Sequence, residues 1–300
     1  MFLFLLLIWG PILVAVGIAV TLRLTLLRGM PRLSTRDAVL AAIAGGLPLL
    51  VTLIPLLDAF GPPVWPWPEL GGRAALPLAL GLLGVILLSF PARPVRPNAS
   101  AQLTPRTIRM FVPLRQPALL AGLVALSLTL ALAAGAASVV DELGRHTMFT
   151  ISLGTTGTES SSQIYGWYYS FPSLCLLAAL VLAAAAAWLR IPRPAWSDDI
   201  DRDTALRRIH AANITRIACG AVLLHLAVVL GSLAGTASMM LSAQAGNIGM
   251  VSLGTPFAAM GPLLSVAQTL ATVAGSALWL LTALTALPVG ARRRARVRVA

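Results

Sequence analysis

His225 is the one ionisable side chain near the middle of a long apolar run, which covers residues 214–234. Ionisable groups inside a membrane are costly and often serve as haem ligands, metal ligands or proton relays. A haem held by two histidines needs a second histidine at the same depth, whereas His146 and His210 fall outside the apolar runs, on opposite sides. A neutral imidazole that hydrogen-bonds to a neighbouring helix explains His225 at least as well. Both interpretations stay open, and His225 is a candidate functional residue.

A dense aromatic stretch at 165–169 is the second candidate site, since it contains all three tyrosines of the protein. It directly precedes an apolar run at 171–189 and follows a polar segment at 155–163. Aromatic belts at the level of the lipid headgroups account for such residues without a specific function. Because rings and polar groups are concentrated here, the segment also predicts a vestibule on the outer side of the membrane. Its candidate lining residues are Tyr165, Trp167, Tyr168 and Tyr169.

Signatures of catalysis and of metal binding are missing from the sequence. It contains no G-x-x-x-x-G-K-[ST], H-E-x-x-H or G-x-S-x-G motif. The spacing of Asp199, Asp201 and Asp203 is that of the start of a calcium loop, but Thr204 and His210 stand where the loop needs Gly and Glu. The chain also has no lysine, which excludes a retinal or pyridoxal Schiff base. We therefore assign no catalytic residue, no metal ligand and no cofactor, and we expect no enzymatic activity.

The candidate residues must be positioned by membrane-spanning helices. The chain is 58% hydrophobic and only 11% charged, against roughly 25% charged in soluble domains, and its mean hydropathy is +0.86. Runs of about 20 apolar residues are long enough to cross a bilayer and must be helical there. The sequence predicts an all-α integral membrane protein with seven transmembrane helices. The expected spans are 2–22, 38–57, 73–90, 117–140, 171–189, 214–234 and 264–288.

The arginines predict the orientation of these spans. Of the 22 basic residues, which are all arginine, 20 fall in alternate connections and in the tail, and only Arg73 and Arg145 fall on the other side. The arginine-rich side is cytoplasmic by the positive-inside rule, so the N-terminus is outside and the C-terminus inside. An even number of spans would disturb this alternation. The use of arginine alone is typical of a GC-rich bacterial genome, and we expect a bacterial inner (plasma) membrane.

Residues 1–290 are expected to form a single transmembrane domain of one leading helix and three helical hairpins, followed by a basic cytoplasmic tail at 291–300. The tetrad Ser-Leu-Gly-Thr occurs at 152–155 and again at 252–255, which raises the possibility that the last two hairpins are a parallel repeat. The final outer connection, 235–263, has no charged residue. It is therefore expected to fold against the membrane or dip into it.

Two functions remain compatible with the sequence. None of the ten carboxylates lies within a span, whereas proton-coupled carriers commonly use buried carboxylates. We therefore expect a permease-like or accessory subunit of a transport system, energised by a partner such as an ATPase. An amphipathic cytoplasmic helix at 197–212, capped by Ser197, is the expected docking element. The alternative is a non-catalytic scaffold, assembly or regulatory subunit. The net charge of +12 is spread over four segments beside helix ends, which favours contact with lipid headgroups over nucleic acid.

A reporter enzyme that is active only outside the cytoplasm tests the predicted orientation. Alkaline phosphatase fused after Ala300 should be inactive, because the arginine-rich tail is predicted to stay in the cytoplasm. The same reporter fused to a chain truncated after Gln163 should be active. Phosphatase activity in intact cells is the measurement. An active Ala300 fusion would show that the orientation is reversed or that the number of spans is even.

Overall fold

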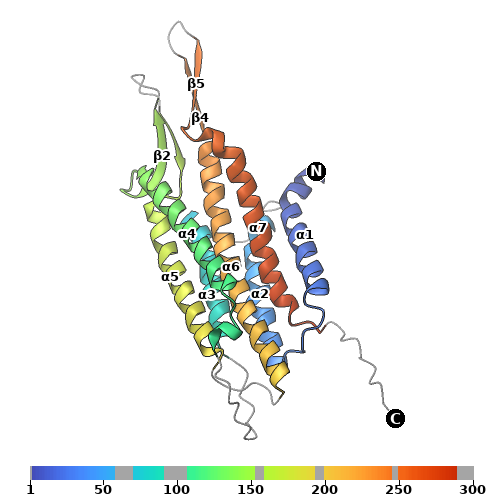
Figure 1. Ribbon diagram of the computed structural model, residues 1–300. Coiled ribbons are helices and arrows are strands. Elements are labelled where there is room, and N and C mark those ends of the chain that lie inside the picture. Colours follow the sequence, from blue (N-terminus) through green and yellow to red (C-terminus); the bar gives the residue numbers. More distant parts are fainter. Residues whose placement is uncertain are drawn as a thin grey trace, which may run out of the picture.

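The computed structural model describes residues 2–57, 70–90, 107–152, 159–192, 199–244 and 249–288. These residues form seven α-helices arranged as an elongated bundle, with two small sheets at one end (Figure 1). That end is called the sheet end below, and the other the opposite end. The helices are α1 (Phe2–Thr25), α2 (Thr35–Leu57), α3 (Leu70–Leu88), α4 (Arg115–Ala136), α5 (Trp167–Arg190), α6 (Ile200–Ala237) and α7 (Gly261–Leu284).

Each predicted apolar run coincides with one of these helices. Within the described residues, five helices are long and apolar enough to cross a membrane: α3, α4, α5, α6 and the segment Ala258–Leu284, which contains α7. A shorter apolar segment, Trp9–Thr25, lies in α1. These helices are compatible with a multi-pass membrane protein. The apolar window of α6 is 67% buried, against 28–33% for the other four, so α6 is the central helix.

The two sheets are a departure from the expected all-α fold. Strand β1 (Val139–Val140) pairs with β2 (His146–Ser152), which pairs with β3 (Glu159–Gln163); both pairings are antiparallel. Residues of β2 alternate between the two faces of the sheet, and Thr147 and Ile151 are buried on one of them. β-Branched and aromatic residues favour such half-buried strands. Short strands of this kind give no apolar run, so they were missed in the sequence.

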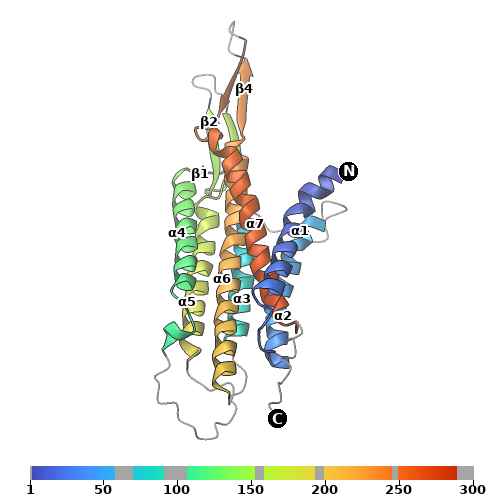
Figure 2. The same ribbon diagram turned by 45° about the vertical axis from the view of Figure 1, so that its right-hand side comes forward.

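The uncharged connection after α6, which the sequence predicts to fold against the membrane or dip into it, contains a β-hairpin. Strands β4 (Met240–Gln244) and β5 (Met250–Gly254) pair in antiparallel fashion, and Figure 2 shows them projecting beyond the helices. The backbone groups satisfy one another across the hairpin, so the segment needs neither charges nor a membrane contact to be ordered.

The Ser-Leu-Gly-Thr tetrads occupy different places in their hairpins. Ser152 is the last residue of β2, the strand that leads toward its hairpin loop. Ser252 lies in the middle of β5, the strand that returns to the helices, and pairs with Ser242. Residues 153–155 of the first tetrad lie outside the described residues. The two tetrads are therefore not equivalent positions of a structural repeat.

The predicted amphipathic helix and the sixth predicted span are one continuous helix, α6. The sequence predicts Ser197 as the N-cap of this helix, but the N-cap is Asp199. Its side chain accepts hydrogen bonds from the backbone N–H groups of Asp201 and Arg202. One turn further, Asp203 and Arg207 form a buried ion pair with 2.8 Å between Oδ2 and Nε. Much of the polar side of this segment therefore faces the protein.

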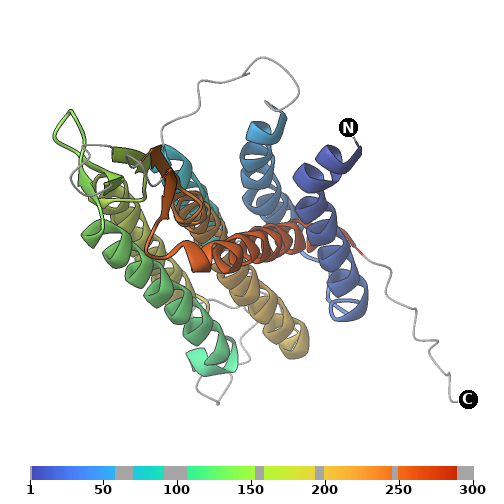
Figure 3. The same ribbon diagram turned by 90° about the horizontal axis from the view of Figure 1, so that it is seen from above.

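Glycine allows the helices to approach closely in the half of the bundle away from the sheets. A Cβ atom at Gly220 would lie 2.5 Å from Cδ1 of Trp279, and one at Gly275 would lie 3.0 Å from the Gly220 carbonyl oxygen. Trp279 is fully buried, and its indole N–H donates to the Ile217 carbonyl at 3.0 Å. Gly45 of α2 lies against the Trp279 carbonyl. In this way α7 is held between α6 on one side and α1 and α2 on the other (Figure 3).

Arg23 joins the first helix to the last. Its guanidinium donates to the carbonyls of Leu284 at 2.9 Å and Leu287 at 2.6 Å, and also to Leu27 in its own chain segment. The carbonyls at the end of a helix lack intrahelical partners, so Arg23 satisfies the end of α7 with a charged donor. This arginine is buried, and its role is structural in addition to any effect on topology.

Replacing Gly45 by Ala tests the close contact between α2 and α7. The new methyl group would overlap the Trp279 carbonyl and lie 2.8 Å from the Ala283 nitrogen, both of which are backbone atoms that cannot rotate away. We expect Gly45→Ala to lower the free energy of unfolding by about 1–3 kcal/mol. Gly46→Ala is the matched control, because nothing lies within 4 Å of its added Cβ. Thermal unfolding in detergent measures both, and equal melting temperatures for the two variants would contradict the assigned contact.

Candidate functional site

A cavity of about 570 Å³ lies between α3, α6 and α7 in the half of the bundle nearest the sheets. Small-molecule sites commonly have volumes of roughly 300–1,000 Å³. Strand β3 contributes to the rim, so the cavity is bounded by a sheet as well as by helices. Its polar lining residues are Arg73, Ser162, Gln163, Ser232, Thr236, Gln268 and Thr272.

Four of these polar residues line the cavity from α6 and α7: Ser232, Thr236, Gln268 and Thr272. Ser232 carries a hydroxyl oxygen that is buried and makes no hydrogen bond within the described residues. Gln268 and Thr272 are one turn apart on α7, and the Thr272 hydroxyl donates back to the Gln268 carbonyl at 2.9 Å. The side-chain amide of Gln268 has no hydrogen-bond partner among the described residues, so it is available to a ligand. Buried polar groups normally have partners, so the lining is suited to a hydrogen-bonding molecule.

Arg73 and Pro77 line the cavity from the first two turns of α3. Pro77 has no N–H and cannot make the helical hydrogen bond to the Arg73 carbonyl. The proline therefore weakens the helix where it borders the cavity. Arg73 is exposed and makes no hydrogen bond or ion pair with the other described residues. It is the only charged residue among those that line the cavity in the described part of the chain.

The cavity ends at the close contact between α6 and α7. Leu224 is its deepest lining residue on α6, and a Cβ atom added at Gly275 would lie 2.8 Å from the Leu224 Cγ. Below Gly275, Trp279 fills the space between the helices. The remaining wall is apolar, from Leu70, Leu76, Ala227 and Val228. The site is therefore open near the sheets and closed toward the opposite end.

A second cavity of about 520 Å³ adjoins the first. The two share Gly231, Gly235 and Gln268 as lining residues. The Gly-x-x-x-Gly spacing of α6 favours a close helix contact, but no atom lies within 4 Å of a Cβ added at Gly235. At Gly231, the Gln268 amide occupies the space that a side chain would take, 2.8 Å from the added Cβ. Gln268 therefore separates two spaces that the glycines leave open.

Two of the predicted aromatic residues are buried beneath the first sheet. Tyr165 and Tyr169 belong to a cluster with Ala74, Ala134 and Val229. Burial raises the pKa of Tyr165 to about 12, and the neighbouring Ser173 hydroxyl offsets only part of that rise. Neither tyrosine lines the cavity. Tyr169 is connected to it by one contact, because the Gln163 amide donates to the Tyr169 hydroxyl.

The other two aromatic residues lie at the surface. Trp167 is 39% exposed and packs against Gly135, while Tyr168 is 46% exposed beneath the Arg145 guanidinium, 4.9 Å from its ring centroid. Arg145 is held by Asp141 in the turn between β1 and β2. The pKa of Asp141 is lowered to about 2, mainly because its carboxylate accepts a hydrogen bond from the backbone N–H of Arg145. Hydrogen bonds from Thr147, Leu143 and the Arg145 side chain add to this effect. The four aromatic residues thus join the sheet to α4 and α5 and do not line one vestibule.

His225 of α6 is buried in the core, where α6 packs against α3. Its Nδ1 is 2.9 Å from the Ala74 carbonyl oxygen, and its ring meets Tyr165 edge-to-face with 5.8 Å between centroids. The imidazole is buried and does not line the cavity. Of the two interpretations given by the sequence, the contacts favour a neutral side chain that hydrogen-bonds to a neighbouring helix.

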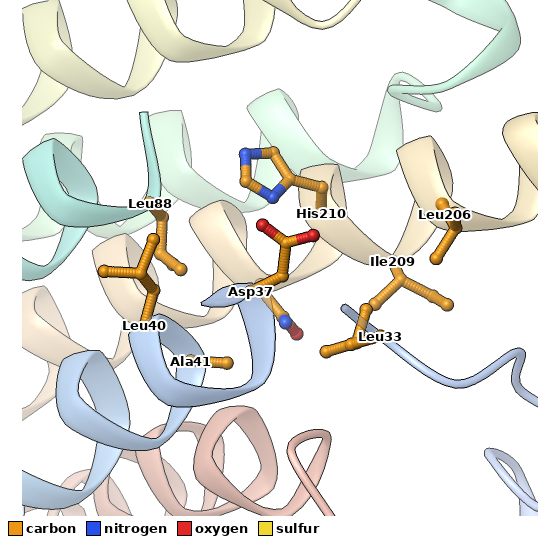
Figure 4. Close-up of a pocket in the computed structure, with 9 residues that line it drawn as sticks. Leu33, Asp37, Leu40, Ala41, Leu88, Leu206, Ile209 and His210 are labelled. Carbon is orange, nitrogen blue, oxygen red and sulfur yellow. The ribbon is translucent and has the colours of Figure 1, made fainter. Parts of the chain in front are cut away.

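At the opposite end, Asp37 of α2 and His210 of α6 face each other across a pocket of about 20 Å³ (Figure 4). A space of this size holds about one water molecule. Ser34 and Asp37 also cap α2 reciprocally: the Ser34 hydroxyl donates to the Asp37 carboxylate at 2.8 Å and accepts from its backbone N–H at 3.1 Å. This pocket is too small for a solute. It lies at the contact between α2 and α6.

The cavity residues come from three helices and a strand, and sequence reasoning missed most of them. One usable signal was Arg73, which is one of only two arginines on its side of the predicted membrane. Another was the spacing of Ser265, Gln268 and Thr272, which places polar groups on one face of an apolar helix. Within the described ranges, no three His, Cys, Asp or Glu side chains gather as metal ligands would.

No protein-family model matches this chain, and neither the curated proteins nor the solved structures include a match.

Replacing His225 by Phe tests its structural role. The variant keeps an aromatic ring against Tyr165 but loses the hydrogen bond to the Ala74 carbonyl. We expect a loss of about 1 kcal/mol in the free energy of unfolding. His225→Ala should lose more, because it also leaves a void in the core. Thermal unfolding in detergent measures both, and a Phe variant as stable as the native chain would contradict the role of the hydrogen bond.

Proposed function

We propose that the protein is a permease-like subunit of a transport system in the plasma membrane, with seven spans, an outer N-terminus and a cytoplasmic C-terminus. The observation that carries this proposal is the cavity between α3, α6 and α7, which is open near the sheets and closed at Leu224 and Trp279. A transporter that binds its solute from outside needs a path of this kind, closed below the site.

The distribution of arginines supports the proposed orientation. Successive helices run in alternate directions through the bundle (Figure 1). The segment after α1, the end of α5 and the start of α6 therefore lie at the opposite end, and they carry Arg28, Arg190 and Arg208. The start of α3, which carries Arg73, and the turn between β1 and β2, which carries Arg145, lie at the sheet end. In the proposed orientation, the sheet end faces outward and the opposite end faces the cytoplasm. The cavity then opens to the outside.

A partner is proposed as the source of energy. No carboxylate lines the cavity within the described residues, so proton coupling at the site lacks its usual group. The first turns of α6 are the proposed contact for a cytoplasmic ATPase. They expose Ile200, Asp201, Arg202 and Arg208, whereas Asp203 and Arg207 are occupied with each other.

A scaffold, assembly or regulatory subunit is the second candidate function. The hairpin of β4 and β5 extends beyond the helices without a charged residue, and it exposes Met240 and Met250. That observation favours contact with another chain. A scaffold, however, has no need for a cavity whose access changes during a cycle, and this difference separates the two candidates.

Cysteine labelling in intact cells tests the transport proposal. In a chain with Cys175 and Cys219 replaced by Ala, Thr272→Cys places a thiol in the cavity. A membrane-impermeant maleimide should label it from outside, because the cavity admits water. Depleting the cells of ATP should change the labelling rate severalfold, since the partner drives opening and closing. Mass spectrometry of the purified protein measures the labelled fraction.

Thr269→Cys is the matched control, one turn from the cavity on the exposed face of α7. It should remain unlabelled, because lipid covers that face and the maleimide needs water. Failure to label Thr272→Cys from outside would overturn the proposed access. Labelling at a rate that ATP depletion leaves unchanged would favour the scaffold instead.

A further inference from the structure

We infer that the ligand of the cavity carries one oxyanion group, a phosphate or a carboxylate, which binds to Arg73. The inference rests on the proposed function, because it names the class of solute that the site takes. Arg73 is the sole charged residue that lines the cavity in the described part of the chain. Arg73 has no ion-pair partner among the described residues, and a positive charge beside an apolar wall favours an anion over a cation.

The position of Arg73 strengthens this preference. It lies in the first turn of α3, which begins at Leu70. The N–H groups of a first helical turn lack intrahelical partners, and the helix dipole makes this end positive. The guanidinium can bind a phosphate or carboxylate through two parallel N–H donors. Glu69, the residue before α3 in the sequence, lies outside the described residues.

Across the cavity, uncharged groups complete the site. The buried Ser232 hydroxyl makes no hydrogen bond within the described residues, and the Gln268 amide lies beside it on α7. Both can bond to hydroxyl groups on the body of a ligand or to further oxygens of its acid group. Leu76, Ala227 and Val228 offer an apolar surface to a carbon skeleton. The volume of about 570 Å³ admits a molecule of the size of a sugar phosphate.

The same acid group can belong to a free solute or to the headgroup of a lipid, and the test separates these sources. The full-length protein is purified in an uncharged detergent. Its melting temperature is measured with glycerol 3-phosphate against glycerol, with glucose 6-phosphate against glucose, and with gluconate against glucose. A second arm compares dihexanoyl phosphatidylglycerol with dihexanoyl phosphatidylcholine.

At least one anionic compound should raise the melting temperature by about 3 °C or more when it is saturating, while its uncharged partner should not. Arg73→Gln should weaken this binding about tenfold or more, which corresponds to about 1.4 kcal/mol. Arg145→Gln is the matched control, because Arg145 lies at the same end of the bundle but outside the cavity. Raising the salt concentration should weaken binding to the native protein, since Arg73 is exposed.

The variant Gly235→Leu tests whether the anion binds inside the cavity. The new side chain enters the cavity, where no atom lies within 4 Å of the added Cβ, so the variant should fold but lose the stabilisation by anions. Gly122→Leu is its control, on the exposed face of α4. A response to the phosphatidylglycerol alone assigns the acid group to a lipid, and a response to the soluble acids assigns it to a solute.

Equal stabilisation by the acids and by their uncharged partners would overturn the inference about the ligand class. So would anion binding that survives Arg73→Gln, or a complete lack of response to every anionic probe. None of these results would alter the labelling of Thr272→Cys, which tests the transport function separately. The converse outcome is that the cysteine stays unlabelled while the purified protein still binds anions through Arg73. That result would overturn the proposed transport function but leave the anion site in place.

Discussion

Trp279 lies where α2, α6 and α7 meet, and the rest of the architecture depends on how closely the backbones approach around it. The indole donates to the Ile217 carbonyl of α6, and Gly220 and Gly45 leave room for the ring and for its own carbonyl. Larger residues at these glycines would push the helices apart. Because α7 is fixed here against α6, small residues nearer the sheets can leave cavities between the two helices without loosening the contact. Gly235 then faces open space, and Gly231 leaves room for the Gln268 amide.

The buried charges at the opposite end have hydrogen-bond partners, whereas some polar side chains near the sheets have none within the described residues. At the opposite end, the buried charges have partners: Arg207 bonds to Asp203 and to the Ile191 carbonyl, and its guanidinium lies 5.4 Å from the Phe111 ring centroid. A buried charge without such partners would cost several kcal/mol. Near the sheets, Ser232 and Gln268 have no protein partner for their side chains within the described residues. The paired charges hold the opposite end together, and the unpartnered groups near the sheets suit a site that awaits a ligand.

The sequence was sufficient for the helices, because a bilayer-length apolar run has few alternatives to a helix. All seven predicted runs coincide with helices, although α4 ends at Ala136, where the chain turns into β1. The strands were missed because β2 to β5 are short and partly polar. The cavity was missed for a different reason: Arg73, Ser232 and Gln268 lie on three helices, and nothing in a single sequence indicates which helix faces meet. Aromatic density pointed to 165–169, but it reflects the burial of Tyr165 and Tyr169 under a sheet that was not expected.

The continuity of α6 connects the two parts of the proposed function. Its 38 residues correspond to roughly 57 Å at 1.5 Å per residue, and no break separates the exposed first turns from the cavity wall at Gly231 and Ser232. A partner that moves Ile200 and Arg208 therefore moves the wall as well, unless the helix bends. The close contact at Gly220 and Trp279 lies between these two regions and would act as the pivot. A docking helix joined to the span by a flexible loop would not transmit such a movement.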